Sequence, residues 1–331
     1  MESTTKSEQC GVSVSQNDIR NANQKTDKKL FPKAFCRVVP DVFGDFTKPL
    51  FSKPTVNIMH TNGAGAKSRQ AYLHWKETGD LTVWKNIAQS AVVMNLDDLV
   101  CSGITNNILL SLSINYNALY IPEEVVNTIV SETENYLESF RLQKIKIHFG
   151  GAKIANLGNL VQPITVETTT ASRIRQNEII ANDRIQDKDV IIGLASGKQD
   201  SLLSPLQTHL PVMKAILENF RPSIHGLVHC SDGGQTRCLN FVNEMHIVKN
   251  NLFAVPPVFS TIQSETNTAW QEMYKLFDMG HRFEIYTKEK IADEIIKIAR
   301  YFNIDAQLIG HCEAAPTKAL TIKSIHGEFK Y

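Results

Sequence analysis

The sequence predicts a mixed α/β (α+β) protein built from two domains. Its 331 residues exceed what one hydrophobic core of ordinary size contains, and 42% of them are apolar. Patterns typical of strands and patterns typical of helices alternate along both halves, which argues against a helical bundle or an all-β sandwich.

We expect three segments along the chain. Residues 1–29 are rich in Ser, Thr, Gln, Asn and Lys and contain few large apolar side chains, which predicts a flexible arm. Residues 30–172 are expected to form an N-terminal domain, and residues 173–331 a C-terminal α/β domain.

The elements of the first half follow from periodicity and from helix-end signals. Apolar residues recur at three- and four-residue steps after Leu81, and Gly103 would end that helix. Pro122, followed by two glutamates, is a favourable first turn. The alternation in KIKIHF predicts a half-exposed strand that Gly150 and Gly151 would break. The expected elements are a helix at 81–103, a strand at 107–114, a helix at 122–142, a strand at 144–149 and a strand at 162–172.

The second half is predicted in the same way. It opens with VIIGLAS, a short apolar run that leads into small residues and is typical of a buried strand. HGLVHC is another strand, which the turn SDGG would stop. The expected elements are strands at 190–196, 225–230, 282–287, 305–310 and 318–324, and helices at 211–220, 264–277 and 288–302.

Composition excludes several function classes. The net charge of +1 and the absence of a basic stripe argue against a nucleic-acid partner. No apolar run approaches the ~20 residues that span a bilayer, so no membrane partner is expected. The N-terminus lacks the apolar centre of a secretory signal, and the six cysteines form no CxxC pair. We therefore expect a cytoplasmic protein with reduced thiols.

The stretch HTNGAGAKS, residues 60–68, is the first candidate for a functional site. Gly63, Gly65 and Lys67 suit a loop that lies against phosphate, but the spacing fits neither GxxxxGK[ST] nor GxGxxG. A plain glycine turn with a solvated lysine explains the stretch equally well.

The stretch MNLDDL, residues 94–99, carries two adjacent carboxylates inside an apolar helical pattern. Asp97 and Asp98 would point about 100° apart on a helix and meet different surroundings. A buried acid is costly unless it is paired or bound to a cation. The alternative is one exposed helix acid and one that caps or bonds locally.

Three further glycine turns adjoin predicted strands. They comprise Gly150-Gly151, Gly233-Gly234 and Met279-Gly280. Each permits close approach of the backbone to a ligand, and each also permits an ordinary tight turn. His229 is expected to be a packed strand histidine rather than a ligand.

Taken in order, these stretches resemble a known family. The series is GAGAKS, NLDDL, FGG, IIGLAS, HCSDGG and FDMGH, with flanking text such as LFPKAFCRVVPD and FNIDAQLIG. The chain is similar, from about Gly11 to its C-terminus, to aminoimidazole ribonucleotide synthetase in its Bacteroidetes-type form. That enzyme is the phosphoribosylformylglycinamidine cyclo-ligase of purine synthesis.

The resemblance implies a fold and a chemistry. N-terminal domains would carry the ATP site and pair into a barrel across a homodimer. ATP and Mg²⁺ would activate the formyl oxygen of a small-molecule substrate by phosphorylation before ring closure. By correspondence, Asp98 and Lys67 are the expected catalytic residues, and Asp98 and Asp97 the expected metal ligands. The expected nucleotide-binding residues are Gly63, Gly65, Lys67, Gly150, Gly151, Gly233 and Gly234.

The chain also departs from the family pattern. Asn62 replaces the aspartate of D-G-x-G-T-K, Asn156 stands where an acid is expected, and Lys153 has entered the same loop. Amide oxygens are weaker Mg²⁺ ligands than carboxylates, so metal binding should be weakened. After IIGLAS the glycine-rich segment that holds the substrate phosphate is missing.

Three functions remain open. The first is a diverged ATP-dependent ligase or cyclase that activates a carbonyl or amide on a substrate lacking the usual phosphate anchor. The second is a non-catalytic relative that serves dimerisation, nucleotide sensing or partner binding. The third is the cyclo-ligase of purine synthesis itself. Retained Lys67 and Asp98 favour the first, and the lost acids favour the second.

Overall fold

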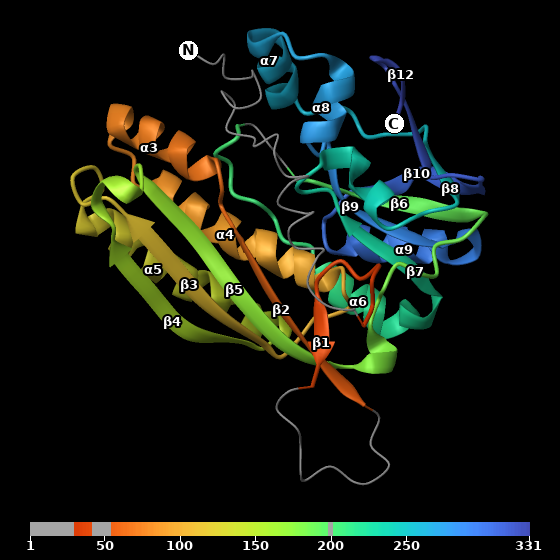
Figure 1. Ribbon diagram of the computed structural model, residues 1–331, viewed down its shortest axis with the longest axis horizontal. Coiled ribbons are helices and arrows are strands. Elements are labelled where there is room, and N and C mark those ends of the chain that lie inside the picture. Colours follow the sequence, from red (N-terminus) through yellow and green to blue (C-terminus); the bar gives the residue numbers. More distant parts are fainter. Residues whose placement is uncertain (1–29, 42–53, 198–200) are drawn as a thin grey trace.

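The computed structural model describes residues 30–41, 54–197 and 201–331 as two β-sheets with helices packed on them (Figure 1). This confirms the predicted mixed α/β class. The predicted arm, residues 1–29, lies outside the described residues. The predicted domain boundary near residue 172 falls inside the last strand that the first half adds to its sheet, and it stays a prediction.

The first sheet has five strands in the order β1-β2-β5-β3-β4. Only β3 and β4 run parallel, and the other neighbours are antiparallel. The strands are β1 (Val38–Pro40), β2 (Thr55–Gly63), β3 (Ile108–Tyr116), β4 (Ile147–Asn156) and β5 (Ile164–Arg175).

The described residues of this half form three α-helices: α3 (Lys67–Thr78), α4 (Thr82–Val100) and α5 (Glu123–Ser139). In Figure 1, α4 and α5 lie along one face of the first sheet. Helix α4 confirms the predicted periodic segment, and Gly103 just beyond its end has a φ of +91° that favours glycine.

The second sheet has seven strands in the order β12-β11-β8-β10-β6-β9-β7. Only β11 and β8 are parallel neighbours. The strands are β6 (Asp189–Ala195), β7 (Ile224–His229), β8 (Met245–Lys249), β9 (His281–Lys288), β10 (Ala306–Ala314), β11 (Ala319–Ser324) and β12 (Gly327–Lys330).

Four α-helices belong to the second half: α6 (Leu210–Phe220), α7 (Pro257–Thr266), α8 (Trp270–Leu276) and α9 (Ala292–Tyr301). Short 3₁₀ turns complete the described elements. They are η1 (Phe140–Gln143), η2 (Gly158–Leu160), η3 (Gln176–Glu178), η4 (Arg221–Ser223), η5 (Gly234–Asn240) and η6 (Glu289–Ile291).

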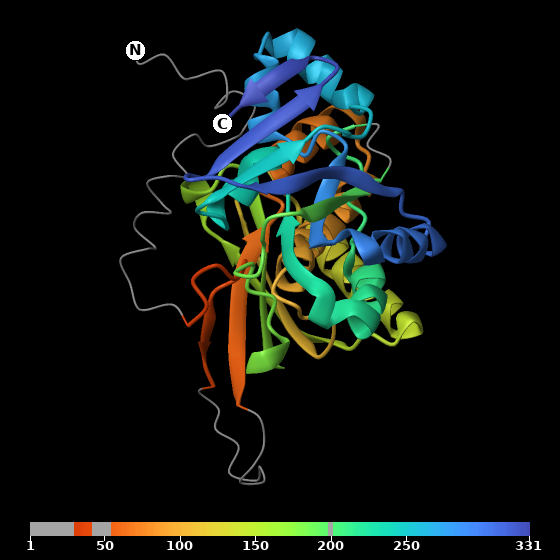
Figure 2. The same cartoon turned by 90° about the vertical axis from the view of Figure 1, so that its right-hand side faces the viewer.

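Helix α4 lies between the two sheets and is buried along most of its length (Figure 1). In Figure 2, viewed from the side of the second half, strands of the second sheet pass in front of the orange helices. Leu96 and Leu99 of α4 share one apolar cluster with Leu227 and Phe283 of the second sheet, so one core continues through both halves. Across the described part of the chain, no helix is long and apolar enough to cross a membrane.

Two expectations about the first half were wrong. HTNGAGAKS is not a loop throughout: its first four residues complete β2, and Lys67 opens α3. Gly150 and Gly151 do not end a strand, because β4 continues to Asn156. The pairing of β4 with β3 shifts register at these glycines, so they form a β-bulge, and Gly151 has a φ of +93°.

Two expectations about the second half also need correction. The helix predicted at 264–277 is two helices, α7 and α8. Asn267, with a φ of +51°, turns the chain between them. Strands β8 and β12 had no counterpart in the sequence analysis. Both are short, and short strands carry little periodic signal.

Gly234 makes the closest backbone approach at the turn after β7. Its φ is +48°, and a Cβ there would lie 2.4 Å from the carbonyl oxygen of Phe277 and 2.7 Å from that of Tyr274. Both obstacles are backbone atoms, so they cannot swing aside. The glycine is therefore required for packing and for backbone conformation together.

We predict that Gly234→Ala lowers the free energy of unfolding by about 2 kcal/mol or more, because strain and backbone overlap add. Gly158→Ala is the matched control. Gly158 has a φ of +53° but no atom within 4 Å of its added Cβ, so only strain of about 1 kcal/mol is expected. Denaturant unfolding of both variants measures this. Equal losses would contradict the packing argument.

Candidate functional site

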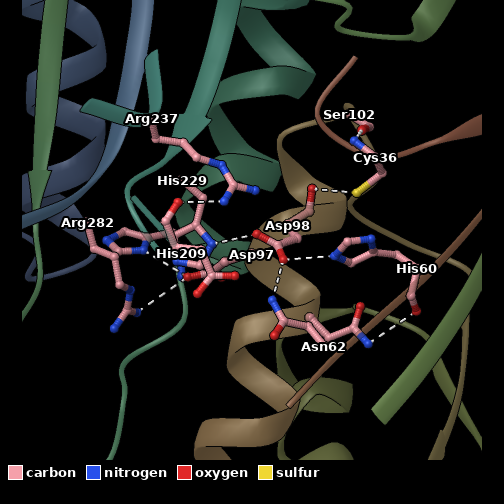
Figure 3. Close-up of polar contacts among 12 residues, drawn as sticks. Cys36, His60, Asn62, Asp97, Asp98, Ser102, His209, His229, Arg237 and Arg282 are labelled. Carbon is pink, nitrogen blue, oxygen red and sulfur yellow. Dashed lines mark hydrogen bonds and ion pairs between the residues drawn. The ribbon is translucent and has the colours of Figure 1, made fainter. Parts of the chain in front are cut away.

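Two carboxylates of α4 form the centre of a buried polar network (Figure 3). Asp97 and Asp98 are 0% and 1% exposed. Neither is therefore an exposed helix acid. Because they are adjacent on a helix, they point in different directions and meet different partners.

Asp98 accepts hydrogen bonds from both halves of the protein. His229 Nδ1 of β7 lies 2.8 Å from Oδ1. On Oδ2, His60 Nε2 lies at 2.9 Å and Asn62 Nδ2 at 2.6 Å, both from β2. Figure 3 shows this carboxylate between His229 on one side and His60 and Asn62 on the other.

Asp97 turns to the segment before α6 and to β9. Its Oδ1 accepts from the Thr208 hydroxyl at 2.6 Å and from the His209 backbone N–H at 2.9 Å. Its Oδ2 accepts from His209 Nδ1 at 3.1 Å and from Arg282 Nη2 at 3.4 Å. All four oxygens of the two aspartates are therefore occupied by protein donors.

These contacts decide the charge of the network. Burial alone would raise the pKa of both carboxyls, but His209 and Arg282 lower the pKa of Asp97 to about 2, and His229 and His60 lower that of Asp98 further. Burial lowers the pKa of His60, yet its neighbours Cys36 and Asp98 outweigh this and raise it to about 11.

His209 is subject to opposing effects. Burial lowers its pKa by disfavouring the charged ring. However, its Nδ1 faces the Asp97 carboxylate and its Nε2 lies 3.1 Å from the carbonyl oxygen of Ala195. Both partners accept hydrogen bonds only, so the imidazolium form satisfies both contacts, and we assign that form.

A cavity of about 200 Å³ lies beside this network, between the two halves. We call it the interface cavity. The first half contributes four lining residues and the second half the rest. They are Ala66, Lys67, Gln70, Met94, Ser201, Leu202, Ser204, Leu206, Cys230, Ser231, Phe259, Leu276, Phe277, Asp278 and Arg282.

Several donors around the interface cavity have no partner among the described residues. They are Nε and Nη1 of Arg282, whose side chain is 3% exposed, and the Ser231 hydroxyl. Burial, with Arg282 nearby, lowers the pKa of Lys67 to about 8, although Asp278 opposes this. Buried donors without partners are uncommon in native proteins and point to an anionic ligand.

A second buried cluster could in principle hold a metal. Cys230, His281 and Glu284 offer ligand atoms within 4.8 Å of one another, the single such group in the described part of the chain. However, the Lys249 ammonium already donates to Glu284. Burial also raises the pKa of the Cys230 thiol well above its usual value. Lys249 therefore supplies the positive charge that a metal would bring.

The predicted site residues fall into different places. Lys67 lines the interface cavity, as does Ala66. Gly63 ends β2, where a Cβ would lie 2.5 Å from the Val166 carbonyl oxygen, so close strand packing requires it. Gly65 has a φ of +51° in the turn before α3. Gly233 and Gly234 form the turn after β7, next to the cavity residue Ser231.

Gly150, Gly151 and Asn156 lie on β4, at the edge of the first sheet (Figure 1). Asn62 lies on β2, three strands away, which corresponds to roughly 14 Å at ordinary strand spacing. A single chain therefore does not bring Asn62 and Asn156 together. Their roles as former metal positions stay predictions.

Three important residues were missed by sequence reasoning: His209, Arg282 and Asp278. A signal existed for Arg282, because it stands next to the apolar residue Phe283 in the predicted strand RFEIYT. The structure buries it to 2% exposure. The same reasoning had selected Asp97 and Asp98. His229 is buried in β7, as expected for a strand histidine, but its contact with Asp98, 131 positions away, has no sequence signature.

Two sequence profiles match the chain. The profile of AIR synthase related protein, N-terminal domain, matches residues 52–169, and that of AIR synthase related protein, C-terminal domain, matches residues 164–323. The phosphoribosylformylglycinamidine cyclo-ligase of Methanococcus vannielii is 25% identical over 288 residues, which are 77% of each chain.

Solved structures share the fold. Phosphoribosylformylglycinamidine synthase II from Thermotoga maritima matches with a TM-score of 0.64 at 12% identity. It covers all of this chain, which spans 51% of that protein. AaThiL, solved in complex with AMPPCP and TMP, matches over the full length of both chains with a TM-score of 0.58 at 11% identity.

We predict that Asn62→Asp destabilises the protein by about 2 kcal/mol or more at neutral pH. It replaces a donor to Asp98 by a second carboxylate at hydrogen-bonding distance. The loss of unfolding free energy should be smaller at acid pH, where the carboxyls of Asp98 and the introduced aspartate share a proton. Denaturant unfolding with and without Mg²⁺ also shows whether the new carboxylate pair binds metal.

Asn156→Asp is the control for this substitution. Asn156 is also a position where an acid was expected, but its Oδ1 accepts from the backbone N–H groups of Ala118 and Gly158, and an aspartate preserves both bonds. Its unfolding free energy should change by less than about 0.5 kcal/mol. If both variants behave alike, the Asn62–Asp98 contact contributes nothing to stability.

Proposed function

The chain belongs to the AIR synthase related family, and we propose that it uses ATP to activate a carbonyl or amide oxygen of a small-molecule substrate. The observation that carries this proposal is the convergence of Lys67 and Arg282 on one cavity between the halves. Phosphoryl transfer depends on positioning and on neutralising charge at the phosphate, and two cations beside one cavity can contribute to both.

The network around α4 supports this role. Asp97 accepts from Nη2 of Arg282, and the Gln207 carbonyl oxygen accepts from the same nitrogen, which holds the guanidinium in one orientation. Nε and Nη1 have no partner among the described residues. Lys67, the first residue of α3, adds a second cation to the lining of the cavity. ATP would supply the phosphoryl group.

Mg²⁺ is not assigned to the predicted ligands Asp97 and Asp98. Their four oxygens already accept hydrogen bonds from protein groups, so a metal would first have to displace these partners. No step of the proposal depends on a metal held by these two residues. A magnesium ion that arrives with the nucleotide remains compatible with it.

Two other functions have specific support. A non-catalytic relative that serves partner binding or nucleotide sensing is favoured by Asn62. Its amide donates to Asp98, so that this buried carboxylate is satisfied by protein groups alone. The cyclo-ligase of purine synthesis is favoured by the name of the relative from Methanococcus vannielii. The missing phosphate-binding segment argues against this last option.

We further propose that the protein is a homodimer that pairs through its first sheet. Helices α3, α4 and α5 pack on one face, and the opposite face carries a cross-strand row of Met59, Ala171 and Leu109. Met59 is 64% and Leu109 58% exposed. Large apolar side chains exposed together on one sheet face are typical of an interface.

We predict that the full chain binds AMPPCP, and that Lys67→Met raises the dissociation constant of AMPPCP at least tenfold. Lys67, with a pKa near 8, is charged below that pH and neutral above it, so wild-type binding should weaken from pH 7 to pH 9. Lys67→Arg should remove this part of the pH dependence, because arginine stays charged. Calorimetric titration measures all three proteins.

Lys85→Met is the control, because Lys85 is exposed on α4 and does not line the interface cavity. Absence of AMPPCP binding in the wild type, with Mg²⁺ present, would favour the non-catalytic relative. Incubation with formylglycinamidine ribonucleotide and Mg·ATP tests the third option. We expect no ring closure, and normal turnover would establish the cyclo-ligase instead.

For the dimer, we expect Leu109→Lys to convert the protein to a monomer, because a charge would then replace one of the two large apolar side chains of the row. Leu142→Lys should leave the dimer intact, since Leu142 is 92% exposed and lies in η1 rather than on the sheet. Light scattering after size-exclusion chromatography reports the mass. A wild-type monomer at micromolar concentration contradicts the proposal.

A further inference from the structure

The wall of the interface cavity is mostly apolar. Carbon atoms of six side chains make up much of it: Met94, Leu202, Leu206, Phe259, Leu276 and Phe277. A sugar placed against such a wall would lose the hydration of its hydroxyl groups without gaining hydrogen-bond partners, which disfavours its binding. The wall therefore suits an apolar ligand body.

The charged side chains around the interface cavity suit an anionic group on the ligand. Among the described lining residues, Lys67 and Arg282 are cations and Asp278 is an anion. Asp278 accepts from the Ser196 hydroxyl at 2.9 Å. Lys67 and Arg282 can together face one carboxylate of a ligand.

One wall is formed by the segment that precedes α6. Asn86 Nδ2 of α4 donates to the Leu203 carbonyl oxygen at 3.1 Å, and Gln89 Nε2 donates to that of Leu206 at 2.9 Å. These bonds hold the described part of the segment against α4. Leu202 and Leu206 thus line the cavity at the point in the sequence where the resemblance led us to expect a phosphate-binding glycine segment.

We propose that the interface cavity binds a small carboxylic acid with an apolar body, such as a single aromatic ring or a short aliphatic chain. At about 200 Å³ the cavity is smaller than pockets for drug-sized ligands, which begin at about 300 Å³. The apolar body packs against Met94, Leu202 and Phe277. The carboxylate faces Lys67 and Arg282.

This inference rests on the proposed function for the reaction of the bound carboxylate with ATP. A carboxylate oxygen attacks the terminal phosphorus of ATP, and an oxygen–phosphorus bond forms. The bond from that phosphorus to the bridging oxygen breaks, and ADP leaves with the electron pair. The product is an acyl phosphate, which an amine nitrogen can attack with release of phosphate.

Calorimetric titration of the full chain without nucleotide tests the inference. The probes are phenylacetate, with an apolar ring and one carboxylate, and ribose 5-phosphate, with a polar body and a phosphate. We expect phenylacetate to bind at least tenfold more tightly. Leu202→Gln should weaken phenylacetate at least fivefold, whereas the exposed control Leu142→Gln should not change it.

Each outcome decides something. The inference would be overturned if ribose 5-phosphate bound as tightly as phenylacetate, or if Leu202→Gln had no effect. It would also be overturned if phenylacetate did not bind at millimolar concentration, which corresponds to a binding free energy of roughly −4 kcal/mol. Phenylacetate binding without AMPPCP binding would sustain the inference and overturn the proposed ATP-dependent function. The two failures are thus distinguishable.

Discussion

The burial of two adjacent carboxylates on α4 is the constraint on which the arrangement of the two halves depends. An ionised carboxylate in an apolar interior is stable only where donors reach it. For Asp98 those donors are His229 of the second sheet and His60 and Asn62 of the first. For Asp97 they are Thr208, His209 and Arg282, all from the second half. Removing the second half would therefore leave both acids under-satisfied as well as exposing the apolar surface of α4.

The same network connects structure to chemistry. Arg282 is fixed by Asp97 and lines the interface cavity, so a structural contact orients a group with free donors. The contact with Asp97 orients Arg282. The oxygens of Asp97 and Asp98 all accept hydrogen bonds from protein groups, so they are less available to a metal ion. Charge neutralisation in the cavity thus falls to Lys67 and Arg282. This balance is consistent with a site that handles an anion through cationic side chains.

Sequence patterns succeeded where one face of an element is apolar. Helix α4 was predicted from apolar spacing. The segment 107–114 was expected to be a buried strand; β3 forms there, but only its alternate residues are buried. Sequence patterns failed at β2, because its inward side includes His60 and Asn62, which face Asp98 rather than an apolar layer. A strand whose core-facing residues are polar has no apolar alternation to detect. At Gly150 and Gly151 a bulge carried the strand through residues that usually stop one.

The sequence by itself determined the family, the mixed α/β class and the presence of two acids that need partners. The order of the motifs indicated the family, and burial of an acid in an apolar helix is a local conflict that can be read from neighbouring residues. Only the tertiary structure decided which groups resolve that conflict. His229 and Arg282 lie 131 and 185 positions from the aspartates that they contact, and spacing in the chain carries no information at such distances. The interface cavity is likewise a property of the folded chain, because its wall is assembled from both halves.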